Sequence, residues 1–201
     1  MRSKINTHKL VVLAMLSAIL LVMSFTPLGY LNIGPLAISL NMIPVGIAAI
    51  ALGAQGGAVL GAMFGLTSFL QCIGIGGTSA MGAILFEISP ILAFIQRFVP
   101  RLLTGLLCGL IYKLLKKTPV RSISTFVTGA CAALLNTVLF MTSLILLFGR
   151  TDYMQGLING KNVIVFICTF VGINAVVEVL AATVIVGAVG KVLEKTKMIG
   201  G

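Results

Sequence analysis

The sequence has very few acidic residues, no tryptophan and one histidine. Only 4 of its 201 residues are Asp or Glu, and charged residues of both signs make up 9% of the chain. His8 by itself argues against a histidine-based catalytic or metal site, because such sites combine several ligands. No grouping of His, Ser and Asp has the spacing of a hydrolytic site. The chain is therefore not expected to be an enzyme.

Cysteine is also scarce, and a phosphate-binding loop is missing. Cys72, Cys108, Cys131 and Cys168 lie within or at the edge of apolar stretches and show no CxxC spacing. We interpret them as small packing residues rather than disulfide partners or metal ligands. Because no GxxxxGK[ST] motif is present, ATP hydrolysis is not expected of this chain. The sequence indicates no cofactor.

Apolar residues, in contrast, are abundant. They make up 59% of the sequence, and the mean hydropathy of +1.17 lies far outside the range of soluble domains. Several apolar runs approach or exceed the roughly 18 residues that mark a candidate membrane-spanning helix. We predict an all-α integral membrane protein, in which residues 1–201 form a single domain of six transmembrane helices with long outer loops.

Turn-forming stretches divide the apolar runs. We expect helices at about 9–25, 42–52, 100–115, 123–148 and 163–193. One more helix follows a tight turn at 53–57 and reaches about residue 72. Outer connections are expected at 26–41, 73–90 and 149–162, the first of them extended or hairpin-like. The fourth helix is expected to start at Pro100, because proline suits the first turn of a helix. The first run lacks a convincing cleavage site, so we expect a retained helix rather than a signal peptide.

The net charge of +10 raises the question of nucleic-acid binding, but its distribution favours a membrane. Basic residues gather before the first span, in the middle of the chain and near its end: Arg2, Lys4, Lys9, Lys113, Lys116, Lys117, Arg121, Lys191, Lys195 and Lys197. These clusters fall on one side if an even number of spans separates them, which is the positive-inside pattern. Both termini are therefore expected in the cytoplasm, and no nucleic acid is expected as a partner.

Two arginines interrupt an apolar segment at Arg97 and Arg101. If a helix starts at Pro100, Arg101 lies in its first turn, where free backbone N–H groups and the helix dipole favour an anion. A guanidinium adds a bidentate partner for a carboxylate or phosphate. The alternatives are that both arginines reach lipid headgroups or pair with Glu87.

Polar residues inside the apolar runs are further candidates for ligand binding. Asn136 lies in mid-helix, where an unpaired amide costs a few kcal/mol, so it needs another helix or a substrate as partner. Asn174 and Glu178 lie on one helix face, and Glu178 either belongs to a functional site or pairs with an internal arginine. Thr67, Gln71 and Asn41 lie near the outer helix ends, where together they indicate a small-molecule pocket.

Small residues form two stripes. Gly57, Gly61 and Gly65 recur at a spacing that lets another helix approach closely. Ala14 and Ala18 lie one above the other on one face of the first helix. Without further information, internal packing is the simplest interpretation of both stripes.

Taken together, these features resemble a known family. The segments "TPLGYLNIGP", "GAVLGAMFGLTSFLQ", "VPRLLTGLLCGLIYKLLKK" and "LLNTVLF", with the Ala14 and Ala18 stripe and the basic inner segments, are similar to S-components of energy-coupling factor (ECF) vitamin transporters, most of all the pantothenate type. The resemblance covers nearly the whole chain. It implies a subunit of the bacterial cytoplasmic membrane that captures a vitamin outside and docks on a transmembrane coupling subunit carried by two ATPases. In that family the stripe on the first helix contacts the coupling subunit.

The resemblance also suggests how the ligand is bound. A pantothenate carboxylate would bind Arg101, and its amide and hydroxyl groups would meet Asn136, Gln71, Thr67 and Asn41. Flavins and pterins are expected to need more aromatic surface than a chain without tryptophan offers, although 11 phenylalanines are present. Riboflavin, a pyrimidine precursor and a nicotinate-like acid remain alternative ligands. Another alternative is an autonomous ion-coupled transporter that uses Glu178.

Overall fold

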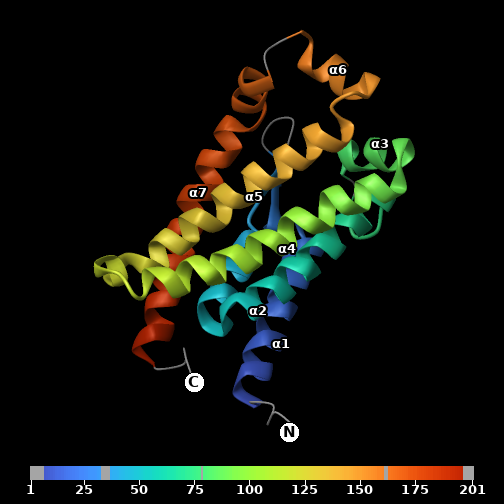
Figure 1. Cartoon of the computed structure of the whole chain (residues 1–201). Helices are drawn as coiled ribbons and strands as arrows, with labels where there is room; N and C mark the ends of the chain where they lie inside the picture. The colour runs from blue at the N-terminus through green and yellow to red at the C-terminus, as the bar shows by residue number, and fades with distance from the viewer. Residues whose placement is uncertain (1–6, 33–36, 78, 161–162, 197–201) are drawn as a thin grey trace, which may run out of the picture.

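The computed structural model describes residues 7–32, 37–77, 79–160 and 163–196, and these residues are mostly helical. Long helices are joined by short helices and one hairpin (Figure 1). In chain order the elements are α1 (Thr7–Phe25), η1 (Pro27–Gly29), β1 (Tyr30–Asn32), β2 (Ala37–Ser39), α2 (Met42–Leu70), η2 (Gln71–Ile73), α3 (Ala80–Ile88), α4 (Pro90–Leu115), η3 (Pro119–Ile123), α5 (Ser124–Phe148), α6 (Asp152–Ile158) and α7 (Val163–Lys195).

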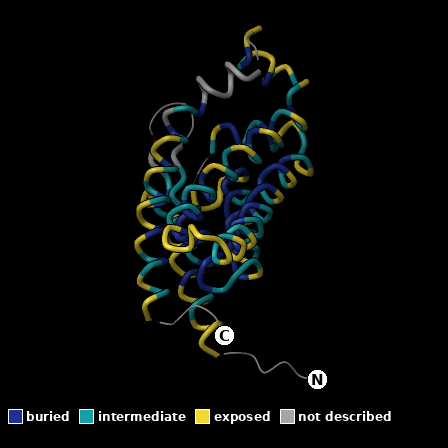
Figure 2. Tube along the Cα trace, turned by 60° about the vertical axis from the view of Figure 1, so that its left-hand side comes forward, coloured by how far each residue is buried: buried dark blue, intermediate teal, exposed yellow. Residues whose placement is uncertain are grey.

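The membrane prediction is confirmed, whereas six separate spans are not. Among the described residues, the helices long and apolar enough to cross a bilayer lie at Thr7–Phe25, Met42–Ile73, Pro90–Leu115, Pro119–Phe148 and Asn174–Lys195. Large apolar side chains cover the outer surfaces of these helices, for example Ile91 and Leu146, which are 74% and 79% exposed. Figure 2 shows the buried residues on the inward faces of the bundle. An apolar outside around a partly polar inside is the pattern expected in a lipid bilayer.

The second candidate span is bent, which explains the difference in number. Gly53 has φ 74° and ψ −164°, a conformation that favours glycine, and it lies at the predicted turn. Before the bend, α2 packs on α7, where a side chain on Gly46 would meet Val186. After the bend it packs on α4, where a side chain on Gly109 would meet Ala54. The two predicted short helices are therefore two arms of one bent segment.

The glycine stripe of α2 packs directly against α4. A Cβ on Gly57 would collide with the carbonyl of Gly105, and a Cβ on Gly61 would collide with the carbonyl of Arg101. Gly65 lies similarly close to Phe98. The predicted packing role of the stripe is thus confirmed. Its consequence for function is that the backbone of α4 is held against α2 at the level of Arg101.

Replacing Gly105 with alanine is expected to destabilise the bundle by about 1–3 kcal/mol, because the new methyl group would overlap the Gly57 carbonyl and push α2 and α4 apart. Thermal unfolding of the purified protein in detergent measures the effect. Gly156→Ala in the short helix α6 is the matched control, since a Cβ at that position would meet no described atom within 4 Å. Equal unfolding midpoints for the two variants would contradict the close packing.

Two expectations about residues 73–100 are wrong. The connection at 73–90 is not simply a loop, because it contains α3, whose N-terminus is capped by Ser79 Oγ accepting a hydrogen bond from the Gly82 N–H at 3.2 Å. Likewise α4 starts at Pro90, after Ser89 as N-cap, and Pro100 lies in its interior. Pro90, not Pro100, occupies the first turn of this helix. A proline inside a membrane helix is tolerated when neighbouring helices support the freed backbone groups.

The other connections also contain secondary structure. β1 and β2 pair antiparallel, with Tyr30 opposite Ser39, as expected for a hairpin-like segment. The segment 149–162 contains α6, and residues 161–162 lie outside the described residues. Cys72, Cys108 and Cys131 are free thiols, while the side chain of Cys168 lies outside the described residues.

Helix ends that carry basic residues lie together. α1 begins and α7 ends at the same end of the bundle, opposite α3 and α6 (Figure 1). At that end Lys116 Nζ lies 2.7 Å from Glu194 Oε1, and the Tyr112 hydroxyl donates to the same carboxylate at 2.8 Å. These contacts connect the basic end of α4 to the basic end of α7. The middle and C-terminal clusters are therefore on one side of the bundle.

Candidate functional site

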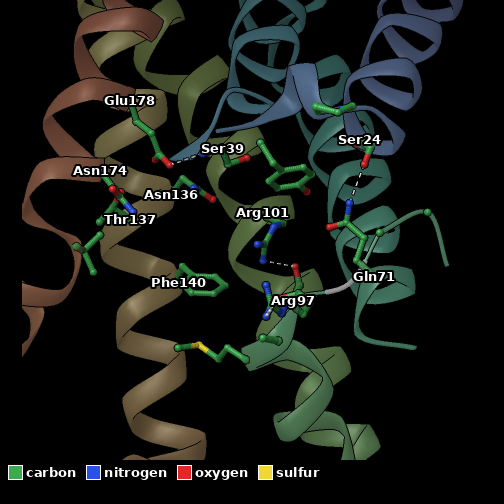
Figure 3. Close-up of a pocket in the computed structure, with 18 of the residues that line it drawn as sticks. Ser24, Ser39, Gln71, Arg97, Arg101, Asn136, Thr137, Phe140, Asn174 and Glu178 are labelled. Atoms are coloured by element: carbon green, nitrogen blue, oxygen red, sulfur yellow. Dashed lines mark hydrogen bonds between the residues drawn. The ribbon is translucent and has the colours of Figure 1, made fainter. Parts of the chain in front are cut away.

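A cavity of about 680 Å³ lies inside the bundle, in the size range of small-molecule sites (Figure 3). Its walls come from the end of α1, the hairpin, the segment around α3, and helices α4, α5 and α7. Six of the predicted site residues line it: Gln71, Arg97, Arg101, Asn136, Asn174 and Glu178. These residues are far apart in the sequence, and the fold brings them to one place.

Arg97 and Arg101 face the cavity from one side of α4, four residues apart. Their side chains are 7% and 5% exposed, so they do not reach lipid headgroups. Because α4 starts at Pro90, Arg101 lies about three turns into the helix. The predicted contribution of a helix N-terminus at Arg101 is therefore wrong. Attraction for an anion at this position comes from the guanidinium groups themselves.

Aromatic rings hold the two guanidinium groups. The Arg101 Cζ lies 4.8 Å from the ring centroids of both Phe64 and Phe140, and the Arg97 Cζ lies 5.3 Å from that of Phe140. Such cation–π contacts stabilise a charge where water is scarce. Arg101 Nη1 also donates to the Arg97 carbonyl at 2.8 Å, and Arg97 Nη2 donates to Ser79 Oγ at 3.2 Å.

No acidic residue in the described part of the chain forms an ion pair with either arginine. The ion pairs found there join Glu194 to Lys116 and to Lys191. The Nε atoms of Arg97 and Arg101 are buried and have no hydrogen-bond partner among the described residues. The alternative pairings with Glu87 or Glu178 are therefore not present. Two buried cations without a counter-ion form a strong electrostatic site for an anionic ligand.

Glu178 lies on the opposite wall and contacts the hairpin. Its Oε1 accepts a hydrogen bond from the Ser39 N–H at 2.6 Å, which connects α7 to β2 (Figure 3). Asn174 lines the same wall one helical turn away. The cavity thus has an acidic side as well as a basic side.

Amide groups lie between these two sides or beside them. The Asn136 Oδ1 atom is buried without a hydrogen-bond partner among the described residues. Gln71 Nε2 donates to the Ser24 carbonyl at 2.7 Å, which fixes the Gln71 side chain on the wall formed by α1. An unpaired amide oxygen such as that of Asn136 is suited to accept a hydrogen bond from a ligand.

Thr67 and Asn41 do not line the cavity. Thr67 Oγ1 lies 3.2 Å from Oγ of Ser24, which lines the cavity. It also lies 3.0 Å from the carbonyl oxygen of Phe64, whose ring contacts Arg101. Asn41 is fully buried beside Gly29 at the end of the hairpin. Both residues lie behind the wall of the cavity.

Several lining residues were not predicted from the sequence. They are polar or aromatic residues of α1, the hairpin, the start of α3 and α5: Ser24, Tyr30, Ser39, Ser79, Thr137 and Phe140. The hydroxyl of Tyr30 is buried, and burial raises the pKa of this phenol although Arg101 and Arg97 act to lower it. It therefore stays protonated near neutral pH and can donate a hydrogen bond. Serine and threonine are common in helices, so their presence alone did not mark them as site residues. Thr137 could have been suggested by its position next to Asn136.

Ala14 and Ala18 lie on the exposed face of α1. The buried face of this helix carries Leu16 and Leu20, which pack against α2. Internal packing is therefore the wrong interpretation of the alanine stripe. The flat strip lies on the outside of the bundle, where another protein or lipid can reach it.

Comparisons with known proteins identify related chains. The family described as "ECF transporter, substrate-specific component" matches residues 8–190. A curated protein of Leuconostoc mesenteroides subsp. mesenteroides, named pantothenate transporter PanT, is 32% identical over 195 residues. The similarity covers 94% of this chain and 93% of that protein. The family match extends over the helices that form the cavity.

Proposed function

Since the chain belongs to the family of substrate-specific components of ECF transporters, we propose that it binds pantothenate in the cavity between α4, α5 and α7. The observation that carries this proposal is the pair of buried arginines without a counter-ion among the described residues, in a chain related to a pantothenate transporter. Pantothenate has one carboxylate, one amide, two hydroxyls and a branched apolar centre. We assign the carboxylate, the amide and the branched apolar centre to residues that line the cavity.

The carboxylate is assigned to the arginines. Arg101 is held between two phenylalanine rings, and its backbone is packed against Gly61 of α2. A guanidinium placed so rigidly loses little freedom when it binds a carboxylate. Its Nε atom, which has no partner among the described residues, provides a donor for one carboxylate oxygen, and Arg97 supplies a second positive charge nearby.

The remaining groups of the ligand are assigned to the amides and to the apolar wall. Asn136 has a buried acceptor oxygen for the ligand amide N–H. Gln71 and Asn174 lie on opposite walls of the cavity, where each can contact a polar group of the ligand. Phe140 and Met141 supply apolar surface for the methyl groups. Thr67 and Asn41 are assigned supporting positions behind this wall.

The purified protein is expected to bind pantothenate at least about 30-fold more tightly than pantothenol, the alcohol that lacks the carboxylate, because pantothenol leaves a buried guanidinium unpaired. Isothermal titration in detergent micelles measures both affinities. Riboflavin, nicotinate and a pyrimidine precursor serve as comparison ligands. Equal affinities for the acid and the alcohol, or tighter binding of one of the comparison vitamins, would contradict the proposal.

Transport requires partners in this proposal. The chain has no phosphate-binding loop, so a transmembrane coupling subunit with two ATPase subunits supplies the energy. The end with the lysine clusters faces the cytoplasm of a bacterial cell, following the positive-inside rule, and the ligand enters from the opposite side. Uptake by the chain alone in proteoliposomes, driven by an ion gradient without ATP, would instead favour an autonomous transporter.

A further inference from the structure

Acidic and basic side chains line the cavity at separate places. Figure 3 shows Glu178 on one side and Arg97 on the other, with Arg101 and Asn136 between them. Glu178 forms no ion pair with either arginine in the part of the chain that the structure describes. A ligand that spans the cavity with its acid group at the arginines therefore has its other end near the Glu178 carboxyl group.

One oxygen of Glu178 is engaged by the hairpin, since Oε1 accepts the Ser39 N–H. No cation among the described residues lies within ion-pair distance of either oxygen. The residue is 8% exposed, yet it lines the cavity. A carboxylate accepts hydrogen bonds and donates none, and its two oxygens together accept about four. The carboxylate thus has capacity left for a hydroxyl or N–H donor of the ligand.

We propose that Glu178 determines the specificity of the cavity, selecting ligands that carry a hydrogen-bond donor at the end remote from their acid group and rejecting ligands with a second acid group. This proposal rests on the function proposed above and adds the recognition of the other end of the molecule. Attraction comes from a charge-assisted hydrogen bond to the carboxylate, which is stronger than a neutral one. Rejection comes from the repulsion of two carboxylates in a poorly hydrated space.

The test compares three acids that differ at the remote end. Pantothenate has hydroxyl groups there, N-(3,3-dimethylbutanoyl)-β-alanine has none, and N-succinyl-β-alanine has a second carboxylate. Wild type is expected to bind pantothenate at least about 10-fold more tightly than the deoxy acid and to bind the succinyl compound most weakly. Glu178→Gln keeps an oxygen for the Ser39 N–H. This variant is expected to lower the ratio of pantothenate affinity to deoxy-acid affinity about 10-fold and to bind the succinyl compound more tightly than wild type does.

The same measurements separate a specificity role from a structural one. If Glu178 only fastens the hairpin to α7, the substitution weakens all three acids by the same factor, and the proposal is overturned. Unchanged affinities for all three acids overturn it as well. Glu87→Gln on the exposed face of α3 is the matched control and should change none of the ratios.

If wild type binds neither pantothenate nor the deoxy acid, the proposed function itself fails and this inference fails with it. If pantothenate binds through Arg101 but the ratios do not respond to Glu178→Gln, only this inference fails.

Discussion

Replacing Arg101 with alanine is expected to weaken pantothenate binding about 30- to 3,000-fold, the range that follows from removing one partner of a buried charge pair. The guanidinium lies between Phe64 and Phe140, and its Nε atom has no partner among the described residues. Arg97 lies one helical turn away, and its Nη2 atom donates to Ser79 Oγ, so it supplies a positive charge nearby but not the same hydrogen-bond donors. Isothermal titration of the purified variant measures the loss.

Two further variants give this experiment its controls. Arg101→Lys keeps the charge but loses the planar geometry, so its affinity should be intermediate, about 10-fold below wild type. Arg121→Ala removes an exposed arginine just beyond the C-terminal end of α4, far along the helix from the cavity, and should leave binding unchanged. Pantothenate binding that survives in Arg101→Ala would remove the proposed carboxylate partner.

Placing leucine at both Ala14 and Ala18 is expected to reduce ATP-driven pantothenate uptake about 5- to 100-fold while leaving ligand binding unchanged, because close contact between membrane helices needs small residues and overpacking costs about 1–3 kcal/mol. Both alanines are on the exposed face of α1, and the cavity is lined by the other end of that helix, from Ser24 onward. Uptake into cells that express the complete transporter, together with titration of the purified subunit, measures the two effects.

A single alanine-to-leucine change on another helix shows whether the position matters. Ala188 is an exposed alanine of α7, and Ala188→Leu should transport normally if the docking face is the strip on α1. Normal uptake by the double α1 variant would discredit the docking role. A parallel loss of ligand binding would instead show that the substitutions disturb the bundle itself.

Local sequence patterns predicted the membrane helices well and one helix start poorly. The apolar runs, the break at Gly53 and the packing stripe at Gly57, Gly61 and Gly65 are all present in the structure. Pro100 misled the prediction because proline suits both a first turn and the interior of a supported membrane helix. Ser89 and Pro90 carry the true start signal, an N-cap followed by proline at the first helical position.

The candidate site was predicted in part, because an isolated polar residue in an apolar run indicates that a partner is needed but not which partner. Arg97, Arg101 and Asn136 were among the expected site residues, and they meet in one cavity. The supporting positions of Thr67 and Asn41 could not be foreseen, because a shift of one residue along a helix turns a side chain by about 100°.

The chain's own residues were sufficient to establish a helical membrane protein, since an apolar run of spanning length can satisfy its backbone hydrogen bonds in lipid only as a helix. Only the tertiary structure determined which polar groups line the same cavity. Ser39 and Glu178 are 139 residues apart yet hydrogen-bonded. The sequence around either residue gives no indication of the other. Their meeting depends on the packing of α7 against β2, which is a property of long-range contacts rather than of local sequence.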